Sequence, residues 1–112
     1  MKKLPHCDKA TIKEAKINKY LLCLEHSDGK SKAKFFFGWG FCLEKWQIFE
    51  QSLRQHPVEH EVVKIETTEF GKKYIVECGL FTPNGYSPCI RSIWMIEDGE
   101  DIPRLVTAYP ID

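Results

Sequence analysis

Apolar residues in the first half of the chain recur with the spacing of an amphipathic helix. Across residues 11–26, apolar side chains fall on roughly one stripe and lysines fall opposite it, which predicts a first helix. The stripe consists of Ile12, Ala15, Tyr20, Leu21 and Leu24.

Two further helices are predicted in the same half of the chain. Ser27 or Asp28 can cap a second, short helix, and Gly38 should end it. A third helix is expected over residues 43–57, where large apolar side chains again recur at helical spacing. Proline lacks the backbone N–H that a helix interior needs, so we expect Pro57 to end this helix.

The second half of the chain is typical of strands. Four segments are rich in β-branched and aromatic residues and are separated by short turn sequences. Short connections join antiparallel neighbours, so these strands should form a meander. The order predicts a single α+β domain over residues 1–112, with N-terminal helices packed on one face of a four-stranded antiparallel sheet. The other face would be open, which makes it the place to look for function. The strands are expected at residues 61–70, 72–80, 87–97 and 103–110.

Alternation assigns side chains of the last two strands to faces of the sheet. Arg91 and Trp94 fall on opposite faces of the third strand. In the fourth strand, Leu105, Thr107 and Tyr109 fall together on one face. A guanidinium is rarely placed in the middle of a strand that buries one side. Arg91 therefore either points outward into solvent or clamps an anion.

The pairing of these two strands depends on the loop between them. A symmetric hairpin through residues 97–101 places Arg91 near Ala108 and Ser92 near Thr107. A slip of one residue exchanges the faces, and the sequence leaves both registers open. With Thr107 and Tyr109 close to Arg91, we expect a charged and hydroxylated patch on the sheet.

Composition narrows the functional classes without choosing one. The 112 residues suffice for one domain, and the 43% hydrophobic content argues against disorder. Basic and acidic residues number 16 each, so the net charge is zero and a nucleic-acid surface requires charge segregation. Such segregation is present, because residues 1–34 hold nine lysines and four acids.

The distribution of apolar residues and cysteines also indicates the cellular compartment of the protein. No apolar run approaches the ~20 residues that span a bilayer, and the N-terminus lacks the apolar stretch of a signal peptide. The five cysteines form no CxxC pattern. We therefore expect a reduced, cytoplasmic protein without membrane association.

The loop before the second helix combines a histidine, a glycine and three lysines. A helix N-terminus favours anions, and Gly29 would let a bulky anion approach the backbone. Lys30, Lys32 and Lys34 add positive charge beside it. The GxxxxGK[ST] pattern of an ATP-binding loop is absent. Two interpretations stay open: an anion site with His26 as general base, or a solvated helix cap with His26 ending the first helix.

Metal chemistry has little support in the residue spacing. Cys23 and His26 stand at C-x-x-H spacing, but two ligands do not make a zinc site. No second pair completes the set, since His56 and His60 straddle Pro57. We therefore expect no metal ion.

Several of these stretches together resemble a known family. The segments YLLCLEHSDGKSKAKFF, FGKKYIVECGL, TPNG and IRSIWMIEDGEDIPRLVTAYP are similar to the pattern of the bacterial domain of unknown function 6883, over residues 17–110. Members of that family are small stand-alone proteins and the ends of large polymorphic toxins. Their order of helices and strands resembles the metal-independent ribonuclease fold of barnase, EndoU, colicin-type and RelE-like toxins. Cys23, Leu24 and Ser27 depart from the family pattern.

The resemblance implies one site and a role for each residue in it. In a metal-independent endoribonuclease, His26 would transfer protons, while Lys32 and Arg91 would neutralise charge on the phosphate. Thr107 would hydrogen-bond a phosphate oxygen, and Tyr109 would stack a base or assist proton transfer. The residues expected to bind substrate are Gly29, Lys30, Lys34, Trp94 and Tyr109.

The resemblance also implies partners: an RNA substrate, no cofactor, and a small antitoxin-like protein that covers the open sheet face. The alternative is a non-catalytic interaction module, in which Arg91, Trp94 and the lysine loop form a docking surface. Thr107 and Tyr109 would then merely pack the sheet. The zero net charge favours this alternative, because RNA affinity relies on several phosphate contacts.

Overall fold

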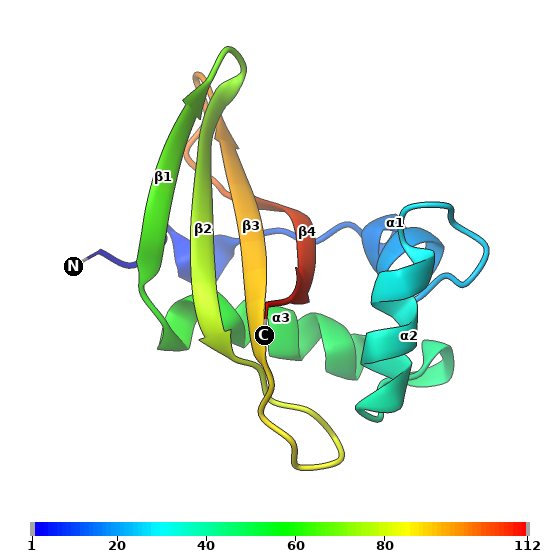
Figure 1. Cartoon of the computed structure of the whole chain (residues 1–112). Coiled ribbons are helices and arrows are strands. Elements are labelled where there is room, and N and C mark those ends of the chain that lie inside the picture. Colours follow the sequence, from blue (N-terminus) through cyan, green and yellow to red (C-terminus); the bar gives the residue numbers. More distant parts are fainter. Residues whose placement is uncertain (1, 112) are drawn as a thin grey trace.

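Helices precede a four-stranded antiparallel sheet in the computed structural model, which describes residues 2–111 (Figure 1). The sheet order is β1-β2-β3-β4, a meander, so the predicted α+β class is confirmed. The helical elements are the 3₁₀ turn η1 (Cys7–Lys9), α1 (Glu14–Lys16), the π-helix η2 (Ile17–Leu21), α2 (Lys30–Gly38), the 3₁₀ turn η3 (Leu43–Lys45) and α3 (Trp46–Glu59). The strands are β1 (Val62–Thr68), β2 (Gly71–Gly79), β3 (Cys89–Glu97) and β4 (Arg104–Pro110).

The first predicted helix is shorter than its periodicity suggested. One α-turn passes into the π-helix η2, in which the Leu22 amide donates to the Ile17 carbonyl at 2.7 Å, and the helix ends at Leu21. The wider turn rotates the buried stripe away from the predicted one, because a π-turn contains an extra residue. Ala15 and Leu24 are consequently exposed, whereas Ile17 and Leu22 are buried.

The ends of α2 and α3 also differ from expectation. Helix α2 begins after Gly29 with no capping side chain, so neither Ser27 nor Asp28 caps it, and it does end at Gly38. Helix α3 does not stop at Pro57 but continues to Glu59, with Pro57 buried. Proline removes one donor near the end of a helix without preventing the last turn, and burial of Pro57 holds that turn in place.

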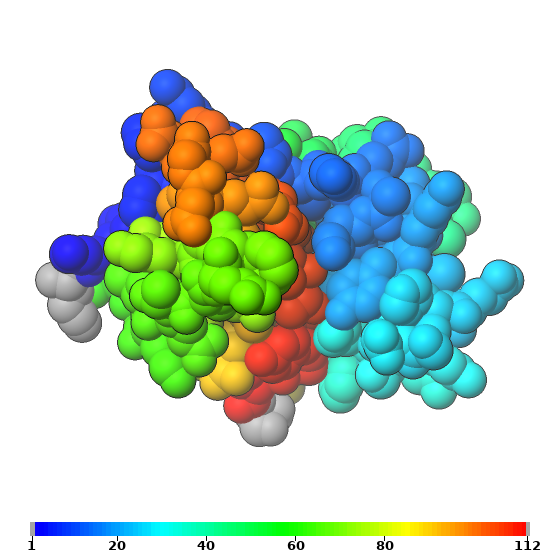
Figure 2. Space-filling model, turned by 90° about the horizontal axis from the view of Figure 1, so that it is seen from above, coloured from blue at the N-terminus to red at the C-terminus, as the bar shows by residue number. Residues whose placement is uncertain are grey.

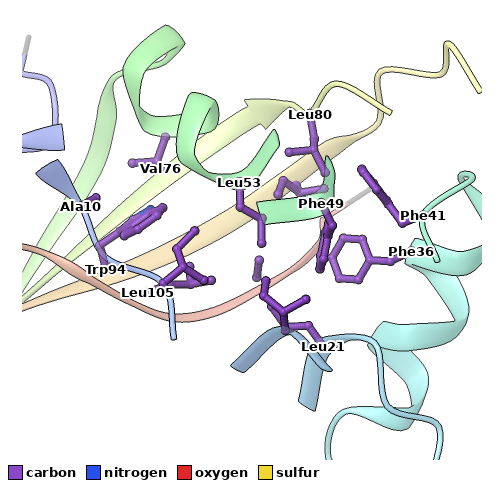
Figure 3. Packing of buried hydrophobic residues seen from close by; sticks show 14 of the residues in the cluster. Ala10, Leu21, Phe36, Phe41, Phe49, Leu53, Val76, Leu80, Trp94 and Leu105 are labelled. Atoms are coloured by element: carbon purple, nitrogen blue, oxygen red, sulfur yellow. The ribbon is translucent and has the colours of Figure 1, made fainter. Parts of the chain in front are cut away.

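The core lies between the helices and the face of the sheet that α3 crosses (Figures 1 and 3). Phe49 of α3 packs against Phe36 and Phe41, with ring centroids 4.6 Å apart in both pairs. Trp94 and Leu105 fill the other end of the same cluster. The aromatic end of the core anchors α2, because Phe36 has no exposed surface.

The register of β3 with β4 differs from the symmetric hairpin. Arg91 pairs with Tyr109 and Ser92 with Ala108, one residue away from the pairing expected above. A bulge in β4 opposite Ile93 and Trp94 shifts the register, because Val106 lies between Thr107 and Leu105, which pair with those two residues. The bulge breaks the simple alternation of β4, which placed Leu105 and Thr107 on one face.

The result is that Leu105 joins Ala108 in the core, while Thr107 and Tyr109 are half-buried near Arg91. The N-terminal segment covers one end of the β4 edge through a parallel bridge between Thr11 and Arg104. Past that bridge, α1, η2 and α2 lie alongside β4 (Figures 1 and 2). This seam between β4 and the helical segment positions the candidate site.

A fully hydrogen-bonded histidine lies inside the core. His56 Nε2 donates to the Cys78 carbonyl at 2.9 Å, so its Nδ1 accepts from the Ser92 hydroxyl at 2.7 Å. Ser92 Oγ in turn accepts from Trp94 Nε1 at 2.9 Å. Burial lowers the pKa of His56 to about 4, and the charge of His60 also lowers it, while the hydrogen bond to Cys78 opposes both.

This histidine predicts a loss of stability in weak acid. The unfolded chain binds a proton at residue 56 below about pH 6.5, whereas the folded chain binds it only below about pH 4. The free energy of unfolding should therefore fall by roughly 3 kcal/mol in total as pH drops through that window. Urea denaturation between pH 7 and pH 4 measures it. His56→Gln should flatten the dependence; an equally steep curve in that variant would contradict the assignment.

Among residues 2–111, every helix is too short or too polar to cross a lipid bilayer.

Candidate functional site

Tyr20 is the centre of a polar cluster on the seam between η2, α2 and β4. Its hydroxyl lies 3.2 Å from Thr107 Oγ1 on β4. The same oxygen accepts a hydrogen bond from Lys32 Nζ on α2. The successive helical elements η2 and α2 therefore meet the distant strand β4 at one phenol oxygen.

Positive charge surrounds this phenol. Lys32 Nζ lies 4.8 Å from the centroid of the Tyr20 ring, and Lys16 Nζ lies 5.2 Å from it. Burial by itself raises the pKa of Tyr20, but hydrogen bonds with Lys32 and Thr107 and the charges of Lys32 and Lys16 outweigh it. The pKa of Tyr20 is lowered from its ordinary value of 10.0 as a result. Tyr20 can therefore ionise more easily than a free tyrosine.

The cluster continues onto the open face of the sheet through Tyr109 and Arg91. Lys32 Nζ lies 5.7 Å from the Tyr109 ring, and the Tyr109 hydroxyl accepts from Arg91 Nη1 at 3.1 Å. Arg91 Nε and Nη2 both donate to Glu77 Oε2 at 2.6 Å. The hydrogen bonds to Tyr109 and Glu77 raise the pKa of Arg91, so the guanidinium stays charged. Tyr20 thus contacts Lys32 and Thr107 directly. Lys32 in turn lies near Tyr109, which is hydrogen-bonded to Arg91.

His26 joins this cluster through its ring rather than through a free nitrogen. Its Nδ1 accepts from the backbone amides of Asp28 and Gly29, both at 3.0 Å, which places the ring proton on Nε2. The ring packs edge-on against Tyr20, with centroids 4.8 Å apart. In this geometry Nδ1 is already occupied, and Nε2–H remains as a donor to a ligand. His26 therefore holds the loop beside Tyr20, and Tyr20 is better placed than His26 to accept a proton.

Gly29 serves a different purpose from the expected one. It is buried, and a Cβ at this position would lie 2.1 Å from the Tyr20 carbonyl oxygen. Its amide donates to His26 rather than facing an open anion site. Glycine is needed here because the loop passes directly over the backbone of Tyr20.

A methyl group at residue 29 should accordingly disturb the site. We expect Gly29→Ala to lower the free energy of unfolding by about 1–3 kcal/mol, because the backbone must shift away from Tyr20. Gly38→Ala is the matched control, since a Cβ there meets nothing within 4 Å and alanine favours a helix. Thermal unfolding of both variants tests this; equal stability of the two would show that the contact is not required.

The remaining candidates lie apart from this cluster. Lys30 and Lys34 are exposed on α2. Trp94 is fully buried in the core and donates its indole N–H to Ser92, so the expectation that it contacts a substrate is wrong. The physical reason is the alternation itself, which turns Trp94 toward α3 when Arg91 faces outward.

Two hollows border the cluster. The first, of about 360 Å³, is lined by Lys13, Ala15, Lys16, Tyr20 and His26. The second, of about 430 Å³, lies on the open sheet face and is lined mainly by Lys64, Glu66, Ile75, Glu77, Arg91 and Tyr109. Ligand groups can therefore approach Tyr20 and Arg91 from the surface. Within residues 2–111, no three His, Cys, Asp or Glu side chains gather as a metal site would require.

Tyr20 and Lys16 are the residues that reasoning from sequence missed. Tyr20 was assigned to an apolar stripe, and the π-turn that aims its hydroxyl at β4 has no recognisable sequence pattern. The available sign was weak: a phenol among aliphatic residues, one helical turn after Lys16.

Known proteins give two points of comparison. The model of a family described as Domain of unknown function (DUF6883) matches residues 3–112. A solved chain in a contact-dependent growth inhibition toxin–immunity protein complex from Klebsiella pneumoniae 342 has a similar fold, with a TM-score of 0.69. The two chains share 16% sequence identity, over 91% of this chain and 100% of that one. No curated protein is similar in sequence to this chain.

Proposed function

This chain belongs to DUF6883, a family of domains of unknown function, and from that premise we propose that it is a toxin domain that cleaves RNA without a metal ion. The observation that carries the proposal is the cluster in which Tyr20, with its lowered pKa, contacts Lys32 and Thr107 beside Arg91 and Tyr109. The fold shared with a chain of the Klebsiella toxin–immunity complex supports a toxin-like role.

Tyr20 is the proposed general base. RNA cleavage of this type begins when the 2′-hydroxyl loses its proton and attacks the adjacent phosphorus. A phenolate at Tyr20 accepts that proton, and its lowered pKa brings it closer to working pH than an ordinary tyrosine. The contacts with Lys32 and Thr107 fix the direction of the phenol oxygen.

Cations stabilise the phosphate as negative charge develops on it. Lys32 lies between the rings of Tyr20 and Tyr109, so a phosphate beside its ammonium contacts both phenols. Arg91 lies 5.6 Å from the Tyr109 ring centroid, and the Tyr109 hydroxyl accepts a hydrogen bond from it. Tyr109 then gives its proton to the leaving 5′-oxygen, and the guanidinium stabilises the phenolate that is left. Cleavage yields a 2′,3′-cyclic phosphate and a 5′-hydroxyl.

His26 and Thr107 act as donors to the substrate in this scheme. His26 Nε2–H is directed to a phosphate oxygen, while its Nδ1 keeps the loop in place through the two backbone amides. Thr107 orients Tyr20 by donating to its phenolate, and once Tyr20 has accepted the proton it donates to Thr107, which frees the Thr107 hydroxyl to donate to a phosphate oxygen. The lysines that line the hollow beside Tyr20 hold the neighbouring phosphates of the strand.

An immunity or antitoxin protein is the proposed partner. The open sheet face carries both charges, with Lys64 and Arg91 next to Glu66 and Glu77, and it also exposes Val63. Such a mixed surface suits a protein interface better than a nucleic-acid one. A protein bound there would cover Arg91 and Tyr109 and so block the site.

Induced expression in bacteria tests the function directly. Wild-type protein without its partner should arrest growth and degrade cellular RNA, and Arg91→Ala or His26→Ala should relieve the arrest while circular dichroism stays unchanged. Harmless expression, with RNA intact, would reject the toxin proposal.

A second candidate function, a non-catalytic docking module, is favoured by one observation. Arg91 is already paired with Glu77, and a cation that is neutralised by a carboxylate attracts phosphate less strongly. The complex from Klebsiella also contains an immunity protein alongside the toxin. Glu77→Gln discriminates between the two functions: it should strengthen RNA binding and cleavage in a nuclease, and weaken a complex that uses the ion pair in a docking module.

A further inference from the structure

One face of α2 runs from the polar cluster around Tyr20 to an aromatic groove. Lys32, Phe35 and Trp39 follow at spacings of three and four residues, so they share a face of the helix. Lys32 meets the Tyr109 ring at 5.7 Å. Phe35 and Trp39 lie 6.0 Å apart and line a groove together with Pro110, the residue after Tyr109. The groove therefore begins where the cluster ends.

The groove is wide and its walls are aromatic. Its volume is about 390 Å³, and its lining is completed by Tyr86 and Pro88 from the segment between β2 and β3 and by Cys89, the first residue of β3. Phe35 is 51% exposed and Tyr86 is 66% exposed, although the neighbouring Phe36 is fully buried. The chain thus exposes two aromatic rings along one groove.

We propose that this groove is a nucleobase subsite, in which an unpaired base of single-stranded RNA stacks on Phe35 and Tyr86. The inference rests on the proposed function and specifies its substrate as single-stranded. Aromatic rings hold bases of any sequence by stacking, while nearby cations follow the phosphates. Lys32, at the end of the groove nearest the cluster, supplies such a cation. A phosphate at Lys32 would place the base of an adjacent nucleotide at Phe35.

Binding of a 2′-O-methylated RNA oligonucleotide tests the subsite without cleavage, because it has no 2′-hydroxyl. The wild-type chain should bind it with quenching of tryptophan fluorescence, and Phe35→Ala or Tyr86→Ala should weaken binding about tenfold. Phe81→Ala is the matched control, since Phe81 is 65% exposed but lines a different hollow. An oligonucleotide with abasic positions should bind the wild-type chain about tenfold more weakly, with little further loss in Phe35→Ala.

Each outcome separates the subsite from the function. If oligonucleotide binding depends on Phe35 but the chain leaves ordinary RNA intact, the subsite is supported and the proposed nuclease function is rejected. Cleavage with the same KM in wild type and Phe35→Ala supports the nuclease and overturns the subsite. Absence of oligonucleotide binding to the wild-type chain also overturns the subsite. So does a Phe35→Ala variant that still binds the oligonucleotide but no longer binds a protein partner, because the groove would then be part of a protein interface.

Discussion

Replacing Tyr20 with phenylalanine should reduce the rate of RNA cleavage by about 10²–10⁴-fold while the protein remains folded. Phenylalanine keeps the ring that packs against His26 but removes the oxygen on which Lys32 and Thr107 converge. The loss should appear in kcat more than in KM, because a general base acts in the transition state. Steady-state cleavage of a fluorescent RNA substrate measures both constants.

The pH profile separates a catalytic role of Tyr20 from a structural one. Tyr20 works as a base only when it is ionised, so the wild-type rate should rise with pH, with its midpoint below the ordinary tyrosine pKa of 10.0. Tyr20→Phe should lack that rise, and Tyr86→Phe, at an exposed tyrosine, should keep it. Should Tyr20→Phe cleave RNA at the wild-type rate, another group must accept the proton.

Replacing Phe36 with alanine should have the largest effect on stability. Its side chain has no exposed surface, and its ring centroid lies 4.6 Å from that of Phe49. Truncation therefore removes buried surface and leaves a cavity. Such changes cost about 3–5 kcal/mol, which is a large part of the 5–15 kcal/mol that typically holds a domain together. Chemical denaturation measures the loss.

The neighbouring phenylalanine supplies the matched comparison. Phe35 belongs to the same three-residue run but is half exposed, so Phe35→Ala should change the free energy of unfolding by no more than about 0.5 kcal/mol. Similar losses in the two variants would mean that α2 does not pack through the side that the structure shows.

The fold followed from sequence where the pattern was repeated over many residues. β-branched and aromatic segments joined by short turns determined the antiparallel meander, and helices ahead of them determined the α+β class. Features that depend on one inserted residue could not be read this way. The π-turn of η2 and the bulge opposite Ile93 and Trp94 each shift a pattern by one position, and neither has a composition of its own.

The candidate site was predicted in part for the same reason. Arg91 stood out because a mid-strand arginine is rare, and it lies in the cluster with Tyr109. Tyr20 was missed because its importance comes from Thr107, 87 positions away, and only the fold brings the two hydroxyls together. Gly29 was noticed correctly but explained wrongly, since the group that approaches it closely is the Tyr20 carbonyl.

The products of one reaction test most directly whether the cluster around Tyr20 cleaves RNA without a metal ion. Purified protein should be incubated with single-stranded RNA in excess chelator, and the fragments should be analysed by mass spectrometry. We predict 2′,3′-cyclic phosphate ends from the wild-type chain and almost none from Tyr20→Phe or Lys32→Ala. Intact RNA with the wild-type chain, or the same fragments from Tyr20→Phe, would contradict it.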